Sequence, residues 1–444
     1  MTLSWLLSFG ILRRISTFRQ QEFDVTGANQ QKMPPYKPAD VLNAHIMGNE
    51  STMYELFDYL RSNDPVARVE HPDYLPFWSL SRYDDIKRIG SENDRFLSAP
   101  RTVLIPTVFE EALLERFGTR NGLETLIHMD RPKHLKLRKV TREWFLPRSI
   151  NSLRAEVEAL SKEFVDKMQE MGSECDFVRD IALLFPLRII LSILGLPREA
   201  EGTMLKLTQE MFGSQDPSLQ RDDSQTAGLE VLNDFGAYFS EVIEDRKKNP
   251  KEDLATVLAN AQVDGEPMNV LDQASYFIIT ATAGHDTTSA SIGGGMKALL
   301  EHPDQLALWR DNPDLDIGAA KEVIRWTSPV RHMVRTATES LELHGKQINA
   351  GDNIALWYPA ANRDPEAIDQ PNKLNLLRDP KQQLAFGYGS HMCLGQHLAA
   401  LEVGCFFREL LPRLQDMQFN GDPEWVKAIF VGGLKSMPLR YSLR

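Results

Sequence analysis

Apolar residues recur with a helical period over most of the chain. Spacings of three and four residues predict helices over 150–171, 185–194, 229–247, 271–302, 317–326 and 394–414. Two shorter stretches are predicted as extended: 77–86 as a strand and turn, and 341–357 as a hairpin of short strands. No internal repeat or low-complexity linker divides the sequence. We therefore expect a mainly α fold with a minor β portion, in which residues 35–444 form one domain.

The segment 271–302 is the longest of these predicted helices. As one helix it would be roughly 48 Å long and would cross the whole domain. Its first half is apolar nearly all round, which is typical of a helix buried in protein. His285 and Asp286 interrupt it well short of a membrane span.

Composition agrees with an ordinary globular protein. Of 444 residues, 42% are hydrophobic and 25% are charged, which excludes a disordered or fibrous chain. The 50 Lys and Arg against 62 Asp and Glu give a net charge of −12, so nucleic acid is not an expected partner. The three cysteines, Cys175, Cys393 and Cys405, form no C-x-x-C pair, which favours a reducing, cytoplasmic protein without disulfides.

The N-terminal region contains a short apolar stretch, 3–12, followed by Arg13 and Arg14. A membrane-spanning helix needs about 20 apolar residues, and a secretory signal has its positive charge before the apolar stretch. We therefore expect residues 1–34 to be a flexible extension without stable membrane insertion.

The most informative cysteine is Cys393. It follows two glycines in the run Phe-Gly-Tyr-Gly-Ser-His-Met-Cys-Leu-Gly at 386–395 and opens a predicted helix. The positive end of a helix dipole and nearby N–H groups favour a thiolate, and glycines allow a large flat group to come close. This pattern suits a ligand for a soft metal. A lone cysteine at such a junction can also be simply buried, which is our interpretation of Cys175 and Cys405.

A zinc site is a weaker alternative for this run. His391, Cys393 and His397 have the spacing H-x-C-x-x-x-H, with Cys393 and His397 on one helical face. A fourth ligand at matching spacing is missing, and zinc would not explain the glycines.

The same run resembles the haem-ligand signature of the cytochrome P450 family, Phe-x-x-Gly-x-His/Arg-x-Cys-x-Gly, and every defined position is filled, including Gly395. The resemblance implies the cytochrome P450 fold, with a long central helix over the haem. It also implies that haem b is bound with Cys393 as its axial thiolate ligand. Phe386 would pack over the proximal face, and His391 would reach a propionate.

The long predicted helix carries Ala283-Gly284-His285-Asp286-Thr287-Thr288, which is similar to the family motif for oxygen handling. Glycine and hydroxyl side chains weaken the helical hydrogen bonds and open a groove for O2 and water. The resemblance implies that Asp286 and Thr287 relay protons. From the residues alone, Asp286 or Thr287 could equally cap a second helix.

Glu322 and Arg325 lie three residues apart on one predicted helix face and match the family's Glu-x-x-Arg. On their own they would be a solvated ion pair. The resemblance implies Arg378 as a third partner, although Leu374 stands where the family usually has phenylalanine.

Two haem propionates need cationic or hydrogen-bonding partners. His134 and Arg138, four apart, match the family's His-x-x-x-Arg, and Arg335 resembles the arginine on the strand after Glu-x-x-Arg. With His391, the dianion would have four partners, although each could instead be a surface base.

A cluster of basic residues surrounds His134 in this acidic chain. The cluster is either an ordinary solvated face or a surface that attracts an acidic partner. The resemblance implies that this helix lies on the proximal side of the haem, where a ferredoxin-type electron donor would dock. The cluster consists of Arg131, Lys133, Lys136, Arg138, Lys139 and Arg142.

The resemblance runs from about Tyr36 to the C-terminus and includes the segment 78–85. It is strongest to the soluble bacterial branch and to its terpineol-hydroxylating members. It implies a monomeric monooxygenase that uses O2 and two electrons to hydroxylate a small terpenoid such as terpineol or cymene. A non-catalytic haem-binding carrier or sensor would share the same motifs. The candidate pocket residues are Ile279, Thr282, Ala283, Val330, Met333, Phe430 and Val431.

Overall fold

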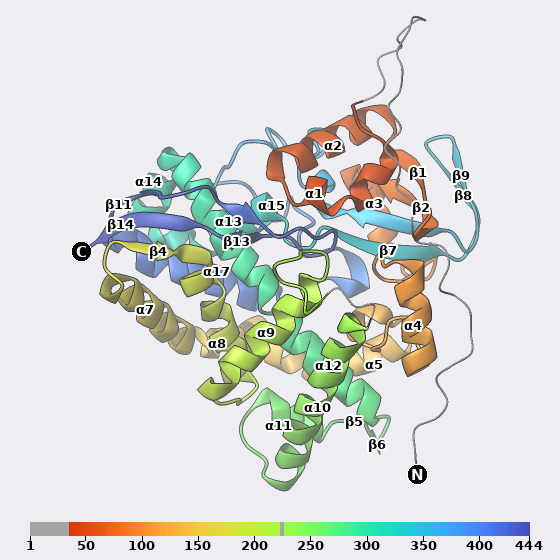
Figure 1. Ribbon diagram of the computed structural model, residues 1–444, viewed down its shortest axis with the longest axis horizontal. Coiled ribbons are helices and arrows are strands. Elements are labelled where there is room, and N and C mark those ends of the chain that lie inside the picture. The colour runs from red at the N-terminus through yellow and green to blue at the C-terminus, as the bar shows by residue number, and fades with distance from the viewer. Residues whose placement is uncertain (1–34, 223–225) are drawn as a thin grey trace, which may run out of the picture. The chain divides into compact units, whose positions relative to one another are not determined.

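The computed structural model describes residues 35–222 and 226–444, so the expectation for residues 1–34 lies outside the described residues. Helices make up most of the unit Pro38–Arg444 (Figure 1). Its α-helices are α1 (Ala44–Met47), α2 (Glu50–Asn63), α3 (Tyr83–Ser91), α4 (Thr107–Phe117), α5 (Lys133–Arg142), α6 (Pro147–Ser152), α7 (Arg154–Glu170), α8 (Leu184–Ile193), α9 (Glu201–Phe212), α10 (Ala227–Lys248), α11 (Leu254–Ala259), α12 (Val270–Ala283), α13 (Asp286–Glu301), α14 (Pro303–Asp311), α15 (Asp316–Thr327), α16 (Tyr358–Ala361) and α17 (Gln396–Leu410).

The strands are short and belong to small sheets. They are β1 (Val66–His71), β2 (Tyr74–Leu80), β3 (Phe96–Leu97), β4 (Glu174–Asp176), β5 (Gln262–Val263), β6 (Glu266–Pro267), β7 (His332–Ala337), β8 (Leu341–Leu343), β9 (Lys346–Ile348), β10 (Asn353–Trp357), β11 (Leu414–Phe419), β12 (Glu424–Trp425), β13 (Leu434–Ser436) and β14 (Pro438–Leu443). The mainly α fold with a minor β portion is therefore confirmed.

The largest sheet joins strands from distant parts of the sequence, in the order β1-β2-β10-β7-β3. Strand β10 runs parallel to β2 and antiparallel to β7, and Arg335 on β7 lies opposite Ile354. Of the hairpin predicted over 341–357, β8 and β9 form the hairpin, whereas β10 pairs with β2 and β7 in the large sheet. The predicted strand at 77–86 ends earlier, because Tyr83 begins α3.

The long helix predicted over 271–302 is two helices, α12 and α13, separated by Gly284 and His285. Two hydroxyls bond to carbonyls one turn back, Thr282 to Ile278 and Thr287 to Ala283, both at 2.8 Å. Such bonds compete with the backbone hydrogen bonds of a helix. At Gly284, α8 comes so close that an added Cβ would lie 2.5 Å from Cδ1 of Ile190. The hydroxyl bonds thus give the break a local cause, and the approach of α8 favours glycine at position 284.

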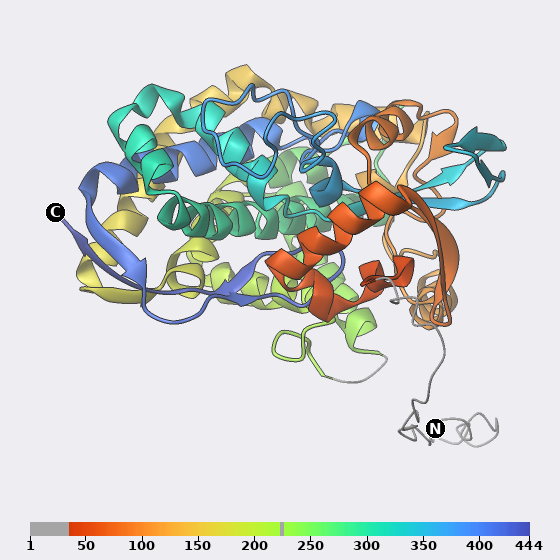
Figure 2. The ribbon, with the colours of Figure 1, turned by 90° about the horizontal axis from the view of Figure 1, so that it is seen from above.

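Helix α13 runs through the middle of the unit and has other helices on several sides (Figure 2). It packs against α8, α15 and α17, and α17 also packs against α7. Fully buried aromatic side chains fill this region, among them Phe164, Phe185, Phe406, Phe407 and Trp309. Within the described ranges, none of the helices combines the length and the apolar character that crossing a bilayer demands.

Candidate cofactor site and active site

A cavity lies between the α12–α13 break, helices α5 and α17, strand β7 and the loop before α17. It brings together residues that the sequence places more than 250 positions apart, such as His134 and Cys393. Its apolar walls include Ile279, Ala283, Val330 and Met333. The other predicted site residues that line it are His134, Arg138, Thr287, Arg335, Phe386, His391, Cys393 and Gly395.

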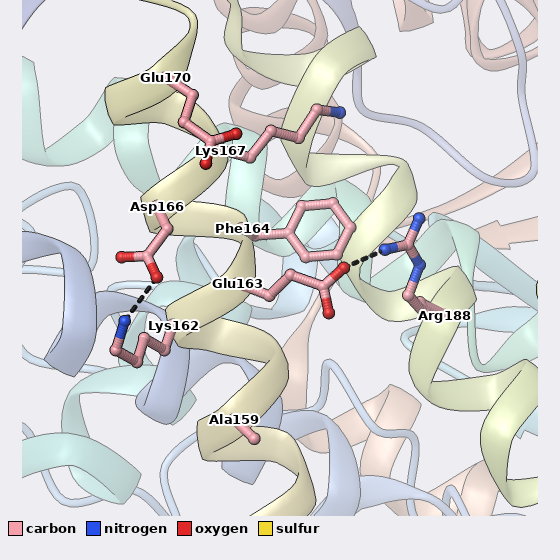
Figure 3. A pocket seen from close by; sticks show the side chains of 8 residues that line it. All are labelled: Ala159, Lys162, Glu163, Phe164, Asp166, Lys167, Glu170 and Arg188. Atoms are coloured by element: carbon pink, nitrogen blue, oxygen red, sulfur yellow. Dashed lines mark hydrogen bonds and ion pairs between the residues drawn. The ribbon is translucent and has the colours of Figure 1, made fainter.

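A second hollow lies between α7 and α8 (Figure 3). The charged side chains around it pair with one another, Glu163 with Arg188 at 2.6 Å and Lys162 with Asp166. Since these four charged groups already pair with one another at a partly exposed surface, this hollow is a weaker candidate for a ligand site.

The cysteine loop is closed by a hydrogen bond from the N–H of Cys393 to the carbonyl of Phe386, at 2.9 Å. Gly389 has a φ of 81°, and an added Cβ would run into the backbone of Gly90. The loop therefore requires glycine there for both its conformation and its packing. Helix α17 begins at Gln396, so Cys393 precedes the helix rather than opening it.

Cys393 is open to the cavity, and the protein around the cavity keeps its sulfur away from bulk water. We predicted that its position would favour the thiolate. Burial instead raises the pKa of Cys393 and outweighs the Gly395 N–H and the charge of Arg138, which lower it. The protein alone thus holds a thiol, and a bound metal is what would deprotonate it.

Four bases gather on one side of the cavity, and two of them have nitrogens without a partner among the described residues. His134 is buried, and both of its ring nitrogens belong to this unpartnered set. Its ring centroid lies 4.1 Å from that of His391, whose Nε2 is 3.1 Å from Oγ of Ser98. Arg335 is buried with its Nε unpartnered, and Arg138 donates to the carbonyl of Met392 at 2.6 Å.

Burial and the neighbouring bases lower the pKa of both histidines. Burial and then the charge of Arg138 lower the pKa of His134 to about 4, and burial, Arg335 and His134 lower the pKa of His391 to about 2. The carboxylate of Asp130 is already bonded to the N–H groups of Ser98 and Ala99, at 2.9 and 2.8 Å. Buried polar groups are normally partnered, so this side of the cavity fits a group that carries negative charge. The two propionates of haem, beside a cysteine sulfur, meet that requirement.

The acid and the alcohol of the predicted relay point in different directions. Thr287 lines the cavity and donates to the carbonyl of Ala283. Asp286 does not line it; its Oδ2 lies 3.3 Å from Nδ1 of His285 and has no hydrogen-bond partner within the described part of the chain.

The structure brings Glu322, Arg325 and Arg378 into one buried cluster. Arg325 donates to both carboxylate oxygens of Glu322, at 2.7 and 2.8 Å, and to the carbonyl of Asn362 at 2.7 Å. Arg378 donates to Oε1 of Glu322 at 3.2 Å. Leu374 is fully buried in the place where phenylalanine is usual.

Three predicted pocket residues do not line the cavity. The hydroxyl of Thr282 bonds to its own helix, and the side chain is buried away from the cavity. Val431 pairs with Val330, and the ring of Phe430 packs against Phe212. The C-terminal segment therefore supports the wall of the cavity from behind.

Sequence reasoning also missed lining residues. Tyr276 lies three residues before Ile279 and seven before Ala283, so the helical period of that segment could have identified it. Glu402 is an acid within the apolar face of α17, which is a signal in itself. Burial raises its pKa well above the usual range.

The basic cluster on α5 is partly neutralised. Lys133 pairs with Glu124 and Asp272, and Lys136 pairs with Asp264. Lys139 and Arg142 are exposed and, among the described residues, form no ion pair within 4.0 Å. The zinc interpretation is wrong, because 35–222 and 226–444 contain no group of three or more His, Cys, Asp or Glu placed to hold a metal ion.

Comparison with known proteins extends the picture to nearly the whole chain. Residues 318–425 match the family model described as Cytochrome P450. Cytochrome P450-terp from Pseudomonas sp is 37% identical over 420 residues, which cover 92% of this chain and 98% of that protein. The crystal structure of CYP108D1 from Novosphingobium aromaticivorans DSM12444 has a TM-score of 0.85 at 40% identity and covers 92% of this chain and 99% of its own.

A third relative was solved in complex with a ligand. Mycobacterium marinum cytochrome P450 CYP268A2, in complex with pseudoionone, has a TM-score of 0.83 at 30% identity. The match covers 92% of this chain and 100% of that one.

Proposed function

The chain belongs to the cytochrome P450 family, and from that premise we propose that it hydroxylates a small terpenoid with electrons from a ferredoxin-type donor. It is a monooxygenase-type oxidoreductase with haem b as its cofactor. The observation that carries the choice of substrate class is that Ile279, Ala283, Val330 and Met333 give the cavity a mainly apolar wall.

An apolar wall with few polar anchors selects a neutral hydrophobic molecule by shape. The relatives support the terpenoid class, since one of them is named Cytochrome P450-terp and another was solved in complex with pseudoionone. A few pocket side chains can reset selectivity on a constant fold, so the wall residues of this chain determine which terpenoid fits.

Haem b supplies an iron with a cysteine thiolate ligand, at which molecular oxygen is activated and its O–O bond is cleaved. In our proposal, Cys393 provides that thiolate from its loop before α17. His134, Arg138, Arg335 and His391 hold the two propionates, which gives the unpartnered buried nitrogens of His134 and Arg335 their acceptors.

Thr287 is the proposed hydroxyl of the proton relay. Its side chain lies at the cavity surface beside the helix break and donates to the Ala283 carbonyl. A change to another staggered rotamer about its Cα–Cβ bond would turn the hydroxyl from that carbonyl toward the cavity, where it can hold dioxygen or water by a hydrogen bond. Asp286, whose side chain is 12% exposed, is the proposed acid that passes protons to this point.

The electron donor is proposed to dock on the exposed face of α5, against Arg131, Lys136, Arg138, Lys139 and Arg142. Arg138 contacts the carbonyl of Met392, the residue before Cys393, so this face is close to the proposed ligand loop. Positive charge there would attract an acidic ferredoxin and would accelerate the encounter more than it strengthens the complex.

The test is to titrate the ferric holoprotein with terpineol and cymene while recording the Soret band. We expect a shift to shorter wavelength, and Val330→Phe, which fills the cavity, should weaken binding at least tenfold. Thr282→Ser is the matched control because the side chain points away from the cavity. Incubation with ferredoxin, its reductase and NAD(P)H should then yield a product heavier by one oxygen atom. Absence of any shift with monoterpenoids, or equal binding by Val330→Phe, would contradict the substrate class.

A further inference from the structure

His285 occupies the break between α12 and α13 and is completely buried. Helices α8 and α9 lie beside this break (Figure 1). The ring touches three different partners, one from each of three segments: the carbonyl of Leu183 before α8, the hydroxyl of Thr208 on α9, and the carboxylate of Asp286 on α13. None of these contacts is required by the function proposed above.

The partners of the two ring nitrogens determine where the protons are. Nε2 lies 2.7 Å from the carbonyl oxygen of Leu183, which can only accept, so Nε2 carries a hydrogen. Nδ1 lies 3.1 Å from Oγ1 of Thr208. That hydroxyl has one hydrogen for two neighbours, Nδ1 and the carbonyl of Leu205, each at 3.1 Å. The Asp286 carboxylate beside Nδ1 favours the arrangement in which Nδ1 is protonated and the hydroxyl donates to Leu205.

A ring that donates from both nitrogens is an imidazolium cation. A buried cation requires a counter-ion, and Asp286 provides one, with Oδ2 3.3 Å from Nδ1. Within the described residues, no other carboxylate lies within 4.0 Å of this ring, and α8 and α9 contribute only a carbonyl and a hydroxyl. Burial opposes protonation, but Asp286 and the Leu183 carbonyl outweigh it and the pKa of His285 is raised.

A second buried histidine shows the contrasting arrangement. Nε2 of His332 accepts from the N–H of Leu104 at 3.0 Å, and its Nδ1 donates to the carbonyl of Ile429 at 2.9 Å. That pattern fits a neutral ring, and burial lowers the pKa of His332 to about 4. The two histidines therefore differ in charge because of their partners and not because of burial, which both share.

We propose that His285 is a positioning residue of the proton relay: as a buried imidazolium it holds the Asp286 side chain, as the carboxylate, against the helix break and away from the cavity. The inference rests on the relay role proposed for Asp286 and Thr287. Because Thr208 takes the Nδ1 hydrogen bond, the carboxylate is held by charge and keeps its Oδ2 free of hydrogen bonds. Oδ2 can thus accept a proton, and the side chain can pass that proton on when it turns toward the cavity.

The first experiment does not depend on turnover. His285→Gln is introduced into the ferric holoprotein with either Asp or Asn at position 286, and the unfolding equilibrium constant is measured in urea. If the ring is the counter-ion of Asp286, His285→Gln should raise this constant about tenfold more in the Asp286 background, because it leaves a buried carboxylate unpaired. The matched control, His332→Gln, should have the same effect in both backgrounds. Equal effects of His285→Gln in the two backgrounds would overturn the proposal.

If His285→Gln does not fold, the single variant Asp286→Asn still tests whether His285 is an imidazolium. A histidine whose pKa is raised in the folded state adds stability below its unfolded pKa of about 6.5 and loses it as the pH rises through the folded value. Asp286→Asn removes the cause of that rise. The ratio of the unfolding constants of variant and wild type should therefore be at least about tenfold at pH 6 and should decrease toward pH 9. A ratio independent of pH would contradict an imidazolium.

The relay is tested by measuring coupling, which is the fraction of NAD(P)H electrons recovered in the hydroxylated product. In His285→Gln, an unpaired carboxyl should take up a proton at neutral pH, so coupling should fall at least fivefold at pH 7 and recover toward pH 8.5. His285→Gln combined with Asp286→Asn should show no such recovery. Wild-type coupling in His285→Gln at every pH would overturn the positioning role, whereas a wild type without any product would contradict the proposed function and leave the urea result standing.

Discussion

Removal of the Glu322 carboxylate should destabilise the protein by about 4 kcal/mol, the largest effect that we expect from a single substitution outside the cavity. The side chains of Glu322, Arg325 and Arg378 are 2%, 1% and 6% exposed, so water cannot replace the lost charge. Breaking a buried ion pair typically costs about 3–5 kcal/mol. The N–H of Asn375, which donates to Oε1 at 3.0 Å, also loses its acceptor, at about 1–3 kcal/mol.

Part of this loss is offset by hydrogen bonds that survive. Arg325 keeps the carbonyl of Asn362 at 2.7 Å, and Arg378 keeps that of Asp369 at 2.7 Å. We therefore place Glu322→Ala near the middle of the range, at about 4 kcal/mol. At roughly 2 °C per kcal/mol for a large domain, the melting temperature should fall by about 8 °C. Glu322→Gln keeps acceptors of the same size without the charge and should lose about half as much.

The assay is urea unfolding of the ferric holoprotein, followed by far-ultraviolet circular dichroism and by the Soret band. Asn362 accepts from the N–H of Leu384 at 2.7 Å, two residues before Phe386, so the cluster is connected to the cysteine loop. Haem release should consequently precede loss of helix in Glu322→Ala. Glu342→Ala, at an exposed position on β8, is the control and should change stability by less than about 0.5 kcal/mol. A loss below about 1 kcal/mol for Glu322→Ala would refute the reasoning.

Three further predictions concern the cavity and the basic face. Thr287→Ala should retain haem but divert at least five times more NAD(P)H electrons to hydrogen peroxide, measured per product formed; unchanged coupling would remove Thr287 from the relay. Burial raises the pKa of Glu402, so the folded state binds more protons than the unfolded one above about pH 4.5, and stability decreases with pH by up to about 1.4 kcal/mol per unit. Glu402→Gln should abolish this slope in melting curves between pH 5 and 8, and an identical slope would contradict it. Lys139→Glu with Arg142→Glu should lower kcat/KM for an acidic ferredoxin roughly tenfold at low salt and little at 0.5 M salt, whereas Lys136→Gln, already paired with Asp264, should have a smaller effect.

Spacing in the sequence predicted several of the site residues, because residues three or four apart in a motif lie on the same helix and stay close together when the chain folds. His134 and Arg138 share α5, and Glu322 and Arg325 share α15. The substitution of Leu374 for phenylalanine did not prevent Arg378 from reaching Glu322, since its guanidinium is anchored by carbonyls of the same loop.

What spacing could not predict depends on partners from other elements. The lack of space for a side chain at Gly284 comes from Ile190 on α8, and the raised pKa of Cys393 follows from burial by surrounding segments. Lys136 on α5 looked free in sequence but meets Asp264 from a hairpin 128 residues away. The direction of a side chain in a helix is equally hidden: Thr282 and Ala283 are adjacent, and only Ala283 faces the cavity.

The candidate site is also supported without any motif, by the rule that buried polar atoms are normally partnered. Unpartnered atoms occur at several places in the described residues, and those of three residues, both ring nitrogens of His134, Nε of Arg335 and Oε2 of Glu402, come together at this one cavity. Each such atom destabilises the fold unless something supplies its partner. Bases on one wall and an exposed thiol on the next require a ligand with both anionic groups and an affinity for sulfur. That requirement comes from electrostatics alone, and it is met by the same haem that the spacing around Cys393 implies, so two independent properties of this chain lead to one cofactor.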